Sequence, residues 1–325
     1  MGLRSGAIAA AAALLLLILA PAEAWAWGPS THVLLGGRVL ANLAALPGPL
    51  RDLLAACSYE FLYGNLSADI TLAKRYVHAS RHCHRWDMGF LLLERAETPR
   101  LKSFALGYLC HLAADTIAHN HFVPRQLLLT SSTPHLGHAY WEYRFDSHVA
   151  PEHLRLAREV VTRDHAAPDE LLETVLTQAV FSFRTNKRLF QRMIHLSNDE
   201  RWQKLFERVV AQSRWDLPEE EVERYLETTC AFVMDFLCRG SESRACSLDP
   251  IGAENLKVAK RIRRRTIRHS RVDSGKLLDL GRHSEEVAAI AELHFVLPAA
   301  PPPPGDSEEL GGFWERFGGA RAIAG

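Results

Sequence analysis

The sequence predicts an all-α fold built from many short and medium-length helices. Along most of the chain after residue 27, apolar residues recur at intervals of three and four, which is the spacing of amphipathic helices. Alternating runs flanked by turn residues, which are typical of strands, are scarce. Of the 325 residues, 47% are hydrophobic and 23% are charged, so the composition is that of a folded protein and excludes a mostly disordered chain.

Two segments show the helical pattern most clearly. Residues 32–46 carry apolar side chains at helical spacing and stop before Pro47-Gly48-Pro49. Residues 104–118 are apolar nearly all round, which predicts a buried helix, and Pro124 suggests that this helix ends near His121. The same three-to-four spacing predicts further helices over residues 136–148, 151–164, 168–183, 185–195, 199–212 and 218–238.

Residues 1–26 have the pattern of a secretory signal peptide. Arg4 supplies a positive charge, residues 7–20 form an uncharged apolar run, and small residues follow at cleavage spacing. Cleavage after Ala24 or after Ala26 fits the pattern equally well. The run is short for a membrane span, so we expect a secreted or periplasmic protein, with a retained N-terminal anchor as the alternative.

Export would permit disulfides, and the chain has six cysteines, none of them in a CxxC pair. The last three, Cys230, Cys238 and Cys246, are close enough in sequence for a local bridge, although the pairing is open. Asn65-Leu66-Ser67 fits the glycosylation sequon.

The charges balance, with 38 Lys and Arg against 38 Asp and Glu. This argues against a surface built as a whole to hold nucleic acid or acidic lipid. One local exception is the run 257–271, which holds eight Lys and Arg and no acid. It could contact anionic head groups or nucleic acid, or it could be an ordinary solvated helix face. Residues 298–305 form a proline-rich spacer before the C-terminal tail, so we expect one helical domain over 27–297.

Histidine is concentrated in one region. Nine of the 16 histidines lie between residues 78 and 148, which suggests metal ligation. His111 and Asp115 are four residues apart, as are His138 and Glu142, so each pair shares one face of a helix and can share a metal ion. A buried helix around His111 strengthens this interpretation, because a buried charge needs a partner or a metal.

With these motifs the chain resembles the zinc-dependent phospholipase C family, whose superfamily includes the S1/P1-type single-strand nucleases. Trp27-Gly28-Pro29-Ser30-Thr31-His32 is similar to the family's mature start. The next two family ligands are matched by Asp69, which follows Gly64-Asn-Leu-Ser-Ala, and by His84, which precedes Arg-Trp-Asp. The resemblance spans Trp27 to about Phe145. It implies an all-helical phospholipase C/P1 nuclease-like domain with a cluster of three zinc ions.

The resemblance also implies which residues hold the ions. One zinc would be bound by Asp69, His84, His111 and Asp115, with His78 and His82 as possible substitutes for His84. A second would be bound by the Trp27 amine and carbonyl, by His32 and by a shared Asp115. The third would be bound by His121, His138 and Glu142, with His119 and His135 outside the ligand set. Asp69 and Asp115 would be the catalytic carboxylates, acting with a water whose pKa zinc lowers to about 7.

Three functions are compatible with this pattern. The first is a phospholipase C-type hydrolase that releases diacylglycerol and a phosphorylated head group. The second is a single-strand nuclease on the same ions. The third is a non-catalytic helical protein that keeps metal for stability. Because the Trp27 amine exists only after the signal peptide is removed, the zinc site favours cleavage after Ala26.

Overall fold

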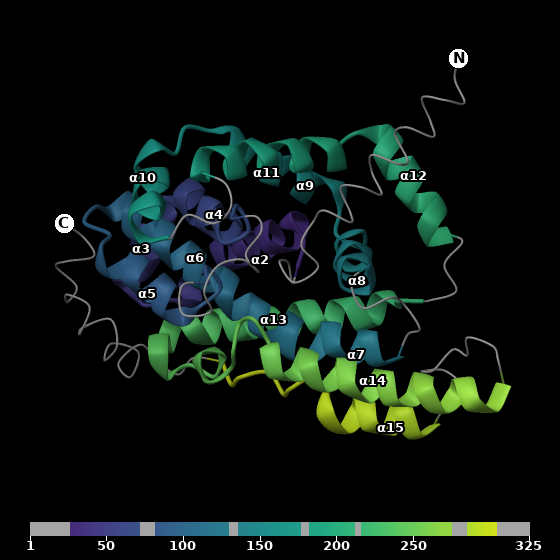
Figure 1. Cartoon of the computed structure of the whole chain (residues 1–325). Coiled ribbons are helices and arrows are strands. Elements are labelled where there is room, and N and C mark those ends of the chain that lie inside the picture. Colours follow the sequence, from purple (N-terminus) through teal and green to yellow (C-terminus); the bar gives the residue numbers. More distant parts are fainter. Residues whose placement is uncertain are drawn as a thin grey trace, which may run out of the picture.

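The computed structural model describes residues 27–71, 82–129, 136–176, 182–211, 216–274 and 285–303. Within these ranges every regular element is a helix, which confirms the all-α prediction (Figure 1). The first half contains α2 (Pro29–Ala41), a 3-10 turn (Leu43–Ala45), α3 (Gly48–Ala56), α4 (Ser58–Ser67), α5 (Trp86–Glu94), α6 (Pro99–Ile117), the π-helix η4 (Ala118–Phe122), α7 (Val123–Leu129) and α8 (Leu136–Asp146). The second half contains α9 (Pro151–Thr162), α10 (Ala166–Val175), α11 (Phe183–Ser197), α12 (Glu200–Ala211), α13 (Glu219–Arg239), two 3-10 turns (Gly240–Glu242 and Ala245–Ser247), α14 (Ala253–Ser274) and α15 (Glu285–His294).

Among the described helices, none combines the length and the apolar character that a membrane crossing requires.

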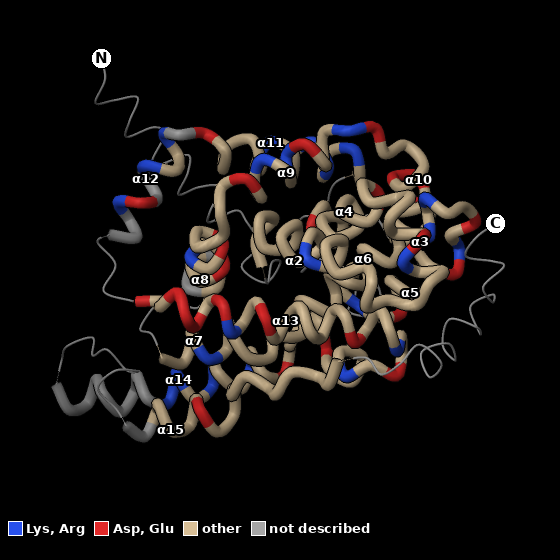
Figure 2. Tube along the Cα trace, turned by 180° about the vertical axis from the view of Figure 1, so that it is seen from behind, with Lys and Arg blue, Asp and Glu red and all other residues tan. Residues whose placement is uncertain are grey.

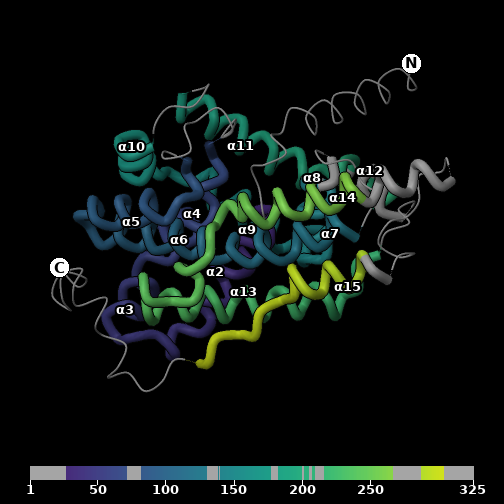
Figure 3. Tube along the Cα trace, turned by 60° about the horizontal axis from the view of Figure 1, so that its bottom comes forward, coloured from purple at the N-terminus to yellow at the C-terminus, as the bar shows by residue number. Residues whose placement is uncertain are grey.

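Helix α6 is the central element of the fold. Pro99 occupies its first turn, and the Thr98 side chain accepts a hydrogen bond from the Leu101 amide, which satisfies one of the first N–H groups. Every residue from Ser103 to Ile117 is buried, as the apolar sequence predicts. Helices α2, α4, α5 and α13 pack around α6 (Figures 1 and 3).

The contact between α4 and α6 is made by two glycines. A Cβ atom on Gly64 would lie 2.1 Å from the Phe104 carbonyl oxygen, and one on Gly107 would lie 2.0 Å from the Phe61 carbonyl oxygen. The two backbones therefore approach more closely than any other residue type would allow. This approach brings the end of α4, and Asp69 just beyond it, to the side of α6 that carries His111.

The end of α6 differs from the sequence prediction. The helix does not stop near His121 but continues through the π-helix η4 into α7, so that Pro124 lies inside a continuous helical path. In the π-turn the Val123 amide bonds to the Ala118 carbonyl, five residues back. Pro124 has no N–H for the Asn120 carbonyl, and the Asn255 side chain donates to that oxygen instead, at 3.3 Å. A donor from a distant part of the chain thus replaces the bond that proline removes.

Other expectations are modified in detail. The predicted helix over 32–46 ends at Ala41, because the Asn42 side chain bonds the Arg38 carbonyl, and it is followed by a 3-10 turn. All six cysteines lie among the described residues and none is in a disulfide. Asn65 and Ser67 of the sequon are buried within α4, where glycosylation could not reach them. The signal-peptide prediction for residues 1–26 lies outside the described residues.

Helices α14 and α15 form an additional layer against α7 (Figures 1 and 3). The layer has a small apolar core of its own, made by Leu128, Ala259, Val287, Ala291 and Phe295. The proline-rich segment begins directly after it. Its start lies against the domain, since Leu297, just before it, packs on the main core and the Ala299 carbonyl accepts a bond from Arg244.

Candidate metal centre

The centre is built on one face of α6. His111 and Asp115 are both fully buried, and the His111 Nε2 lies 3.3 Å from the Asp115 Oδ2, as the four-residue spacing predicts. The His111 ring is oriented from behind, because its Nδ1 lies 2.8 Å from the Asn65 carbonyl oxygen. That carbonyl accepts a hydrogen bond from the Nδ1–H group, so the Nε2 lone pair faces Asp115 and is available to a metal.

Two further predicted ligands reach the same place from the region after α4. The His84 Nε2 lies 3.1 Å from the Asp115 Oδ2 and 3.1 Å from the His111 Nε2. The Asp69 Oδ1 lies 3.3 Å from the His84 Nε2 and 3.9 Å from the His111 Nε2. Asp69, His84 and His111 therefore form a group whose donor atoms lie within reach of one ion. His82, one of the possible substitutes, accepts a hydrogen bond from the His84 amide, and His78 lies outside the described residues.

Helix α2 supplies His32. Its ring stacks on that of His111 with the centroids 3.8 Å apart, and its Nε2 lies 3.4 Å from the Asp115 Oδ1. His32, His111 and Asp115 form a second group of converging donor atoms. Asp115 is thus placed between the two groups, with one carboxylate oxygen toward each.

A third group differs from the predicted set. His138 and Glu142 of α8 are brought together as expected, with the His138 Nε2 2.9 Å from the Glu142 Oε1. The imidazole that completes the group is His119, not His121. His119 is buried, and its Nδ1 lies 2.6 Å from the Pro250 carbonyl oxygen, which leaves Nε2 to face the group. His121 is only half-buried and interacts with the Val296 backbone after α15.

The start of α2 is tied to α8 by a carboxylate. Asp146 accepts hydrogen bonds from the Thr31 amide and hydroxyl, both at 2.8 Å, and from the Ser30 amide at 3.3 Å. A Cβ on Gly28 would lie 2.4 Å from the Asp146 carboxyl carbon, so glycine leaves room for this contact. Asp146 satisfies the first amides of α2 and places a negative charge at the positive end of the helix.

The indole of Trp27 is buried at the same end of α2. It packs against Phe122 and Phe145, with ring centroids 5.1 Å and 4.0 Å away. Its Nε1 donates to the Ala114 carbonyl, at 3.2 Å, next to Asp115 in the chain. The side chain therefore anchors the Trp27 backbone beside the face of α6 that carries Asp115.

Burial favours the neutral form of His32 and His119. Burial, with His111 close by, lowers the pKa of His32, and burial lowers the pKa of His119 to about 4. Burial alone would raise the pKa of Asp115, but the interactions with His111, His32 and His84 hold it well below its ordinary value. A charged Asp115 carboxylate and neutral His32 and His119 rings are in the protonation state that a metal requires of its ligands.

Several buried polar atoms at the centre are left without hydrogen bonds. Among the described residues, hydrogen-bond partners are missing for both nitrogens of His32, both carboxylate oxygens of Asp115 and the Nε2 of His119. Such atoms are costly to bury, and a bound cation would satisfy them. Imidazole nitrogen and carboxylate oxygen are ligands that zinc accepts, so the residues present fit zinc.

Two residues at the centre lay outside the predicted set. His119 follows Asp115 by four residues, so the repeat 111, 115, 119 was a signal that could have found it. Asp146 carries no comparable signal, because its partners Ser30 and Thr31 are more than a hundred positions away. Two tryptophans of the same region are used in packing: Trp141 is buried in the core, and Trp86 packs on Phe236 while its Nε1 donates to the Leu248 carbonyl.

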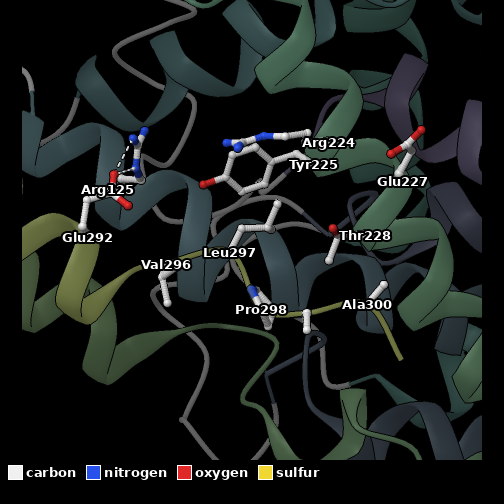
Figure 4. A pocket seen from close by; sticks show the side chains of 11 residues that line it. Arg125, Arg224, Tyr225, Glu227, Thr228, Glu292, Val296, Leu297, Pro298 and Ala300 are labelled. Atoms are coloured by element: carbon white, nitrogen blue, oxygen red, sulfur yellow. Dashed lines mark hydrogen bonds and ion pairs between the residues drawn. The ribbon is translucent and has the colours of Figure 1, made fainter. Parts of the chain in front are cut away.

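A pocket of about 530 Å³ lies beyond Trp27, between α7, α13, α15 and the segment after α15 (Figure 4). Tyr225 lines it and also contacts Trp27, while the Arg125–Glu292 ion pair stands at one side. Its lining residues include none of the predicted ligands. The pocket is therefore separate from the candidate metal centre.

Comparison with known proteins agrees with this geometry. No curated protein and no solved structure matches the chain. Residues 31–186 match the model of the family described as zinc dependent phospholipase C. The matched range contains all the predicted ligands except Trp27, and also His119. Residues 31–186, which carry this centre, therefore match a domain of the zinc-dependent phospholipase C family.

Proposed function

We propose that the protein is a zinc-dependent phosphodiesterase that cleaves phospholipids at the glycerol side of the phosphate. The observation that carries the proposal is the convergence of three buried donor groups around α6, with Asp115 between two of them, in a domain of this family. The reaction adds water across the P–O bond. The water oxygen becomes a phosphate oxygen, the glycerol oxygen takes a proton, and diacylglycerol and a phosphorylated head group are released.

The ligand set that we propose holds three ions. Asp69, His84, His111 and Asp115 would hold the first. His32 and Asp115, with the Trp27 amine and carbonyl, would hold the second. The group His119, His138 and Glu142 would hold the third, in place of the group with His121 that the resemblance implies.

Bound zinc would supply Lewis-acid charge for the phosphoryl oxygens and would lower the pKa of a bound water to about 7. The chain's own residues set the geometry. Asp115 directs one oxygen toward His32 and the other toward His84 and His111. It therefore connects two ligand groups and fixes their relative position. Asp69, with Oδ1 3.3 Å from His84, is the carboxylate we assign to accept a proton from the attacking water. Burial of all these groups excludes bulk water from the centre.

The proposal is tested by zinc analysis and parallel assays on one preparation of the secreted protein. We expect about three zinc ions per chain and hydrolysis of phosphatidylcholine. Asp115→Asn should remain folded and lose activity. One zinc ion or none would overturn the proposed centre. Cleavage of single-stranded DNA without lipid hydrolysis would favour the nuclease. A wild type that holds zinc but hydrolyses neither substrate, with an unfolded Asp115→Asn variant, would favour a structural metal.

The third ion is tested by a matched pair of variants. We expect His119→Ala to bind one zinc ion fewer, and His121→Ala, two residues away, to keep the wild-type zinc content. The reverse result would restore the ligand set with His121.

We further propose that the signal peptide is removed after Ala26, so that the Trp27 amine becomes a ligand. What supports this is the buried Trp27 side chain beside Asp115. Intact mass of the secreted protein should show Trp27 as the first residue. A chain that begins at Trp25 would contradict both the cleavage point and the amine ligand.

We also propose that the basic run of α14 contacts anionic head groups when the enzyme works at a lipid surface. Lys257, Arg261 and Arg264 are exposed on α14 and recur at spacings of four and three. Charges at this spacing share one face of the helix and attract an anionic membrane. Arg263, in the same run, is buried and is not part of this face.

A further inference from the structure

The loop before α14 and the first turn of α14, residues 248–255, lie outside the range that matches the family and contact the π-helix that carries His119. The Pro250 carbonyl accepts from the His119 Nδ1 at 2.6 Å, 131 positions away in the chain. The Asp249 carbonyl accepts from the Asn120 side chain at 2.8 Å. Two neighbouring carbonyls of the loop thus bind two neighbouring side chains of η4.

Asn255 completes the connection from the first turn of α14. Its Nδ2 donates to the Asn120 side-chain oxygen at 3.0 Å and to the Asn120 backbone carbonyl at 3.3 Å. The second oxygen is the one that Pro124 leaves without a helical donor. The Asn120 Nδ2 also donates to the Thr116 carbonyl at 2.8 Å, so Asn120 joins α6, the loop and α14.

Gly252 sets how closely the loop approaches. Its φ is +60°, and a Cβ would lie 2.3 Å from the His119 carbonyl oxygen. Glycine is therefore required both by the backbone conformation and by the contact. The loop is held in turn by Asp249, whose carboxylate accepts from the Ile251 and Ala253 amides, and by Trp86, which donates to the Leu248 carbonyl.

We propose that Asn255 and Gly252 are positioning residues for the His119 metal site, so that the α14 layer is needed for the third zinc ion but not for the other two. This rests on the proposed function. A π-turn next to a proline has no complete hydrogen-bond ladder of its own. The loop and α14 supply the missing donor and hold the His119 ring with Nε2 toward His138 and Glu142. The other two ligand groups have outer supports elsewhere, such as the Asn65 carbonyl behind His111.

The test compares Asn255→Ala and Asn255→Asp with Glu254→Ala. Asparagine to aspartate keeps the shape and removes the donor. Glu254 is the adjacent exposed residue, and within the described part of the chain its ion pair is with the exposed Lys257. Zinc content is followed as a chelator is added to the secreted, signal-cleaved chain. Hydrogen exchange of the amides of residues 119–122 is followed with and without the chelator.

We expect both Asn255 variants to bind one of the three ions about 10–100-fold more weakly, which is the usual effect of losing an outer support. The other two ions should keep their affinity, excess zinc should restore kcat with an unchanged KM, and exchange at 119–122 should accelerate. Glu254→Ala should behave as wild type. Wild-type affinity for all three ions in both Asn255 variants, or equal weakening of all three, would overturn the proposal.

Failure of this positioning proposal can be distinguished from failure of the proposed function. If the wild type itself holds fewer than three zinc ions, the three-ion centre is wrong. In that case the hydrogen exchange of the chelator-treated protein still tests whether Asn255 positions the π-helix. Faster exchange at 119–122 in the Asn255 variants supports it, and unchanged exchange overturns it.

Discussion

At the scale of single residues, the centre depends on what stands behind each imidazole. His111 is oriented by the Asn65 carbonyl and His119 by the Pro250 carbonyl, so both rings direct Nε2 inward. The pKa of the Asp115 carboxyl is held well below its ordinary value, and burial lowers the pKa of His119 to about 4. These are local electrostatic consequences of burial, and they make the stability of the protein sensitive to acid.

We predict that the zinc-depleted protein loses stability as the pH falls from about 6.5 toward 4. The folded pKa of His119 is about 4, below its ordinary value of 6.5, so only the unfolded chain takes up the proton in this window. The loss from His119 is on the order of 3 kcal/mol. The lowered pKa of His32 acts in the same direction, and that of Asp115 adds a loss below its ordinary value. The raised pKa of Asp146 opposes these effects.

Urea unfolding at a series of pH values measures this change. Stability that stays constant or rises between pH 6.5 and 4 would contradict the assignment of buried neutral imidazoles. A His119→Ala variant provides the control, because its pH dependence should be the weaker of the two.

We predict that Asp146→Ala destabilises the protein by about 1–3 kcal/mol, because it leaves first-turn amides of α2 without an acceptor. The change should also lower the affinity for the ion held by His32, since α2 carries that residue. Ser147→Ala removes the hydroxyl's bond to the nearby Arg144 carbonyl and serves as the neighbouring control. Urea unfolding and zinc titration measure the two effects. Equal stability of both variants would show that Asp146 does not anchor α2.

At the scale of elements, the two glycines between α4 and α6 decide how close the helices approach. The close approach is what allows a backbone carbonyl of α4, that of Asn65, to reach the His111 ring on α6. A larger residue would separate the helices and withdraw both Asn65 and Asp69 from the centre.

We predict that Gly107→Ala destabilises the fold by about 1–3 kcal/mol or more, because the added methyl group meets backbone atoms that cannot move aside. Gly37→Ala is the matched control. A Cβ on Gly37, inside α2, meets nothing within 4 Å, so alanine should stabilise the helix by about 0.5–1 kcal/mol. Thermal unfolding of both variants checks the pair, and similar melting temperatures would contradict the close packing of α4 on α6.

At the scale of the whole molecule, most Lys, Arg, Asp and Glu positions lie along the outer helices, around inner helices that are mainly uncharged (Figure 2), although Asp69, Asp115 and Arg263 are buried. Helices α14 and α15 form a layer on one side of the inner helices, and α9 and α11 lie on another (Figure 1). Each layer carries an exposed basic row, with Lys257, Arg261 and Arg264 on α14 and Arg184, Arg188 and Arg192 on α11.

We predict that reversing the three charges on α14 to glutamate weakens binding to vesicles that contain anionic phospholipid, by about 1 kcal/mol for each lost cation. The same reversal on α11 changes the net charge equally and should have a smaller effect. Vesicle sedimentation at low and high salt measures both variants. Equal losses would mean that only net charge matters, and no loss would remove α14 from the proposed contact.

The sequence predicted the parts of this protein that depend on local periodicity. His111 lies four residues before Asp115, and His138 lies four residues before Glu142. Each pair shares a helix face in the structure, because a turn of α-helix holds 3.6 residues whatever surrounds it. The apolar run from Phe104 likewise predicted a buried helix. Because ionisable residues on that helix are buried, a bound cation would stabilise them.

Only the tertiary structure decided which histidine joins His138 and Glu142, and how α2 is anchored. The continuation of α6 through a π-turn depends on donors and acceptors from residues 249–255, far along the chain, and Asp146 reaches the first turn of α2 from the end of α8. The sequence by itself thus determined the helical class and the pairs of side chains that share a helix face, which are consequences of short-range geometry. The choice between His119 and His121 is a matter of long-range hydrogen bonding, which a periodic pattern does not encode.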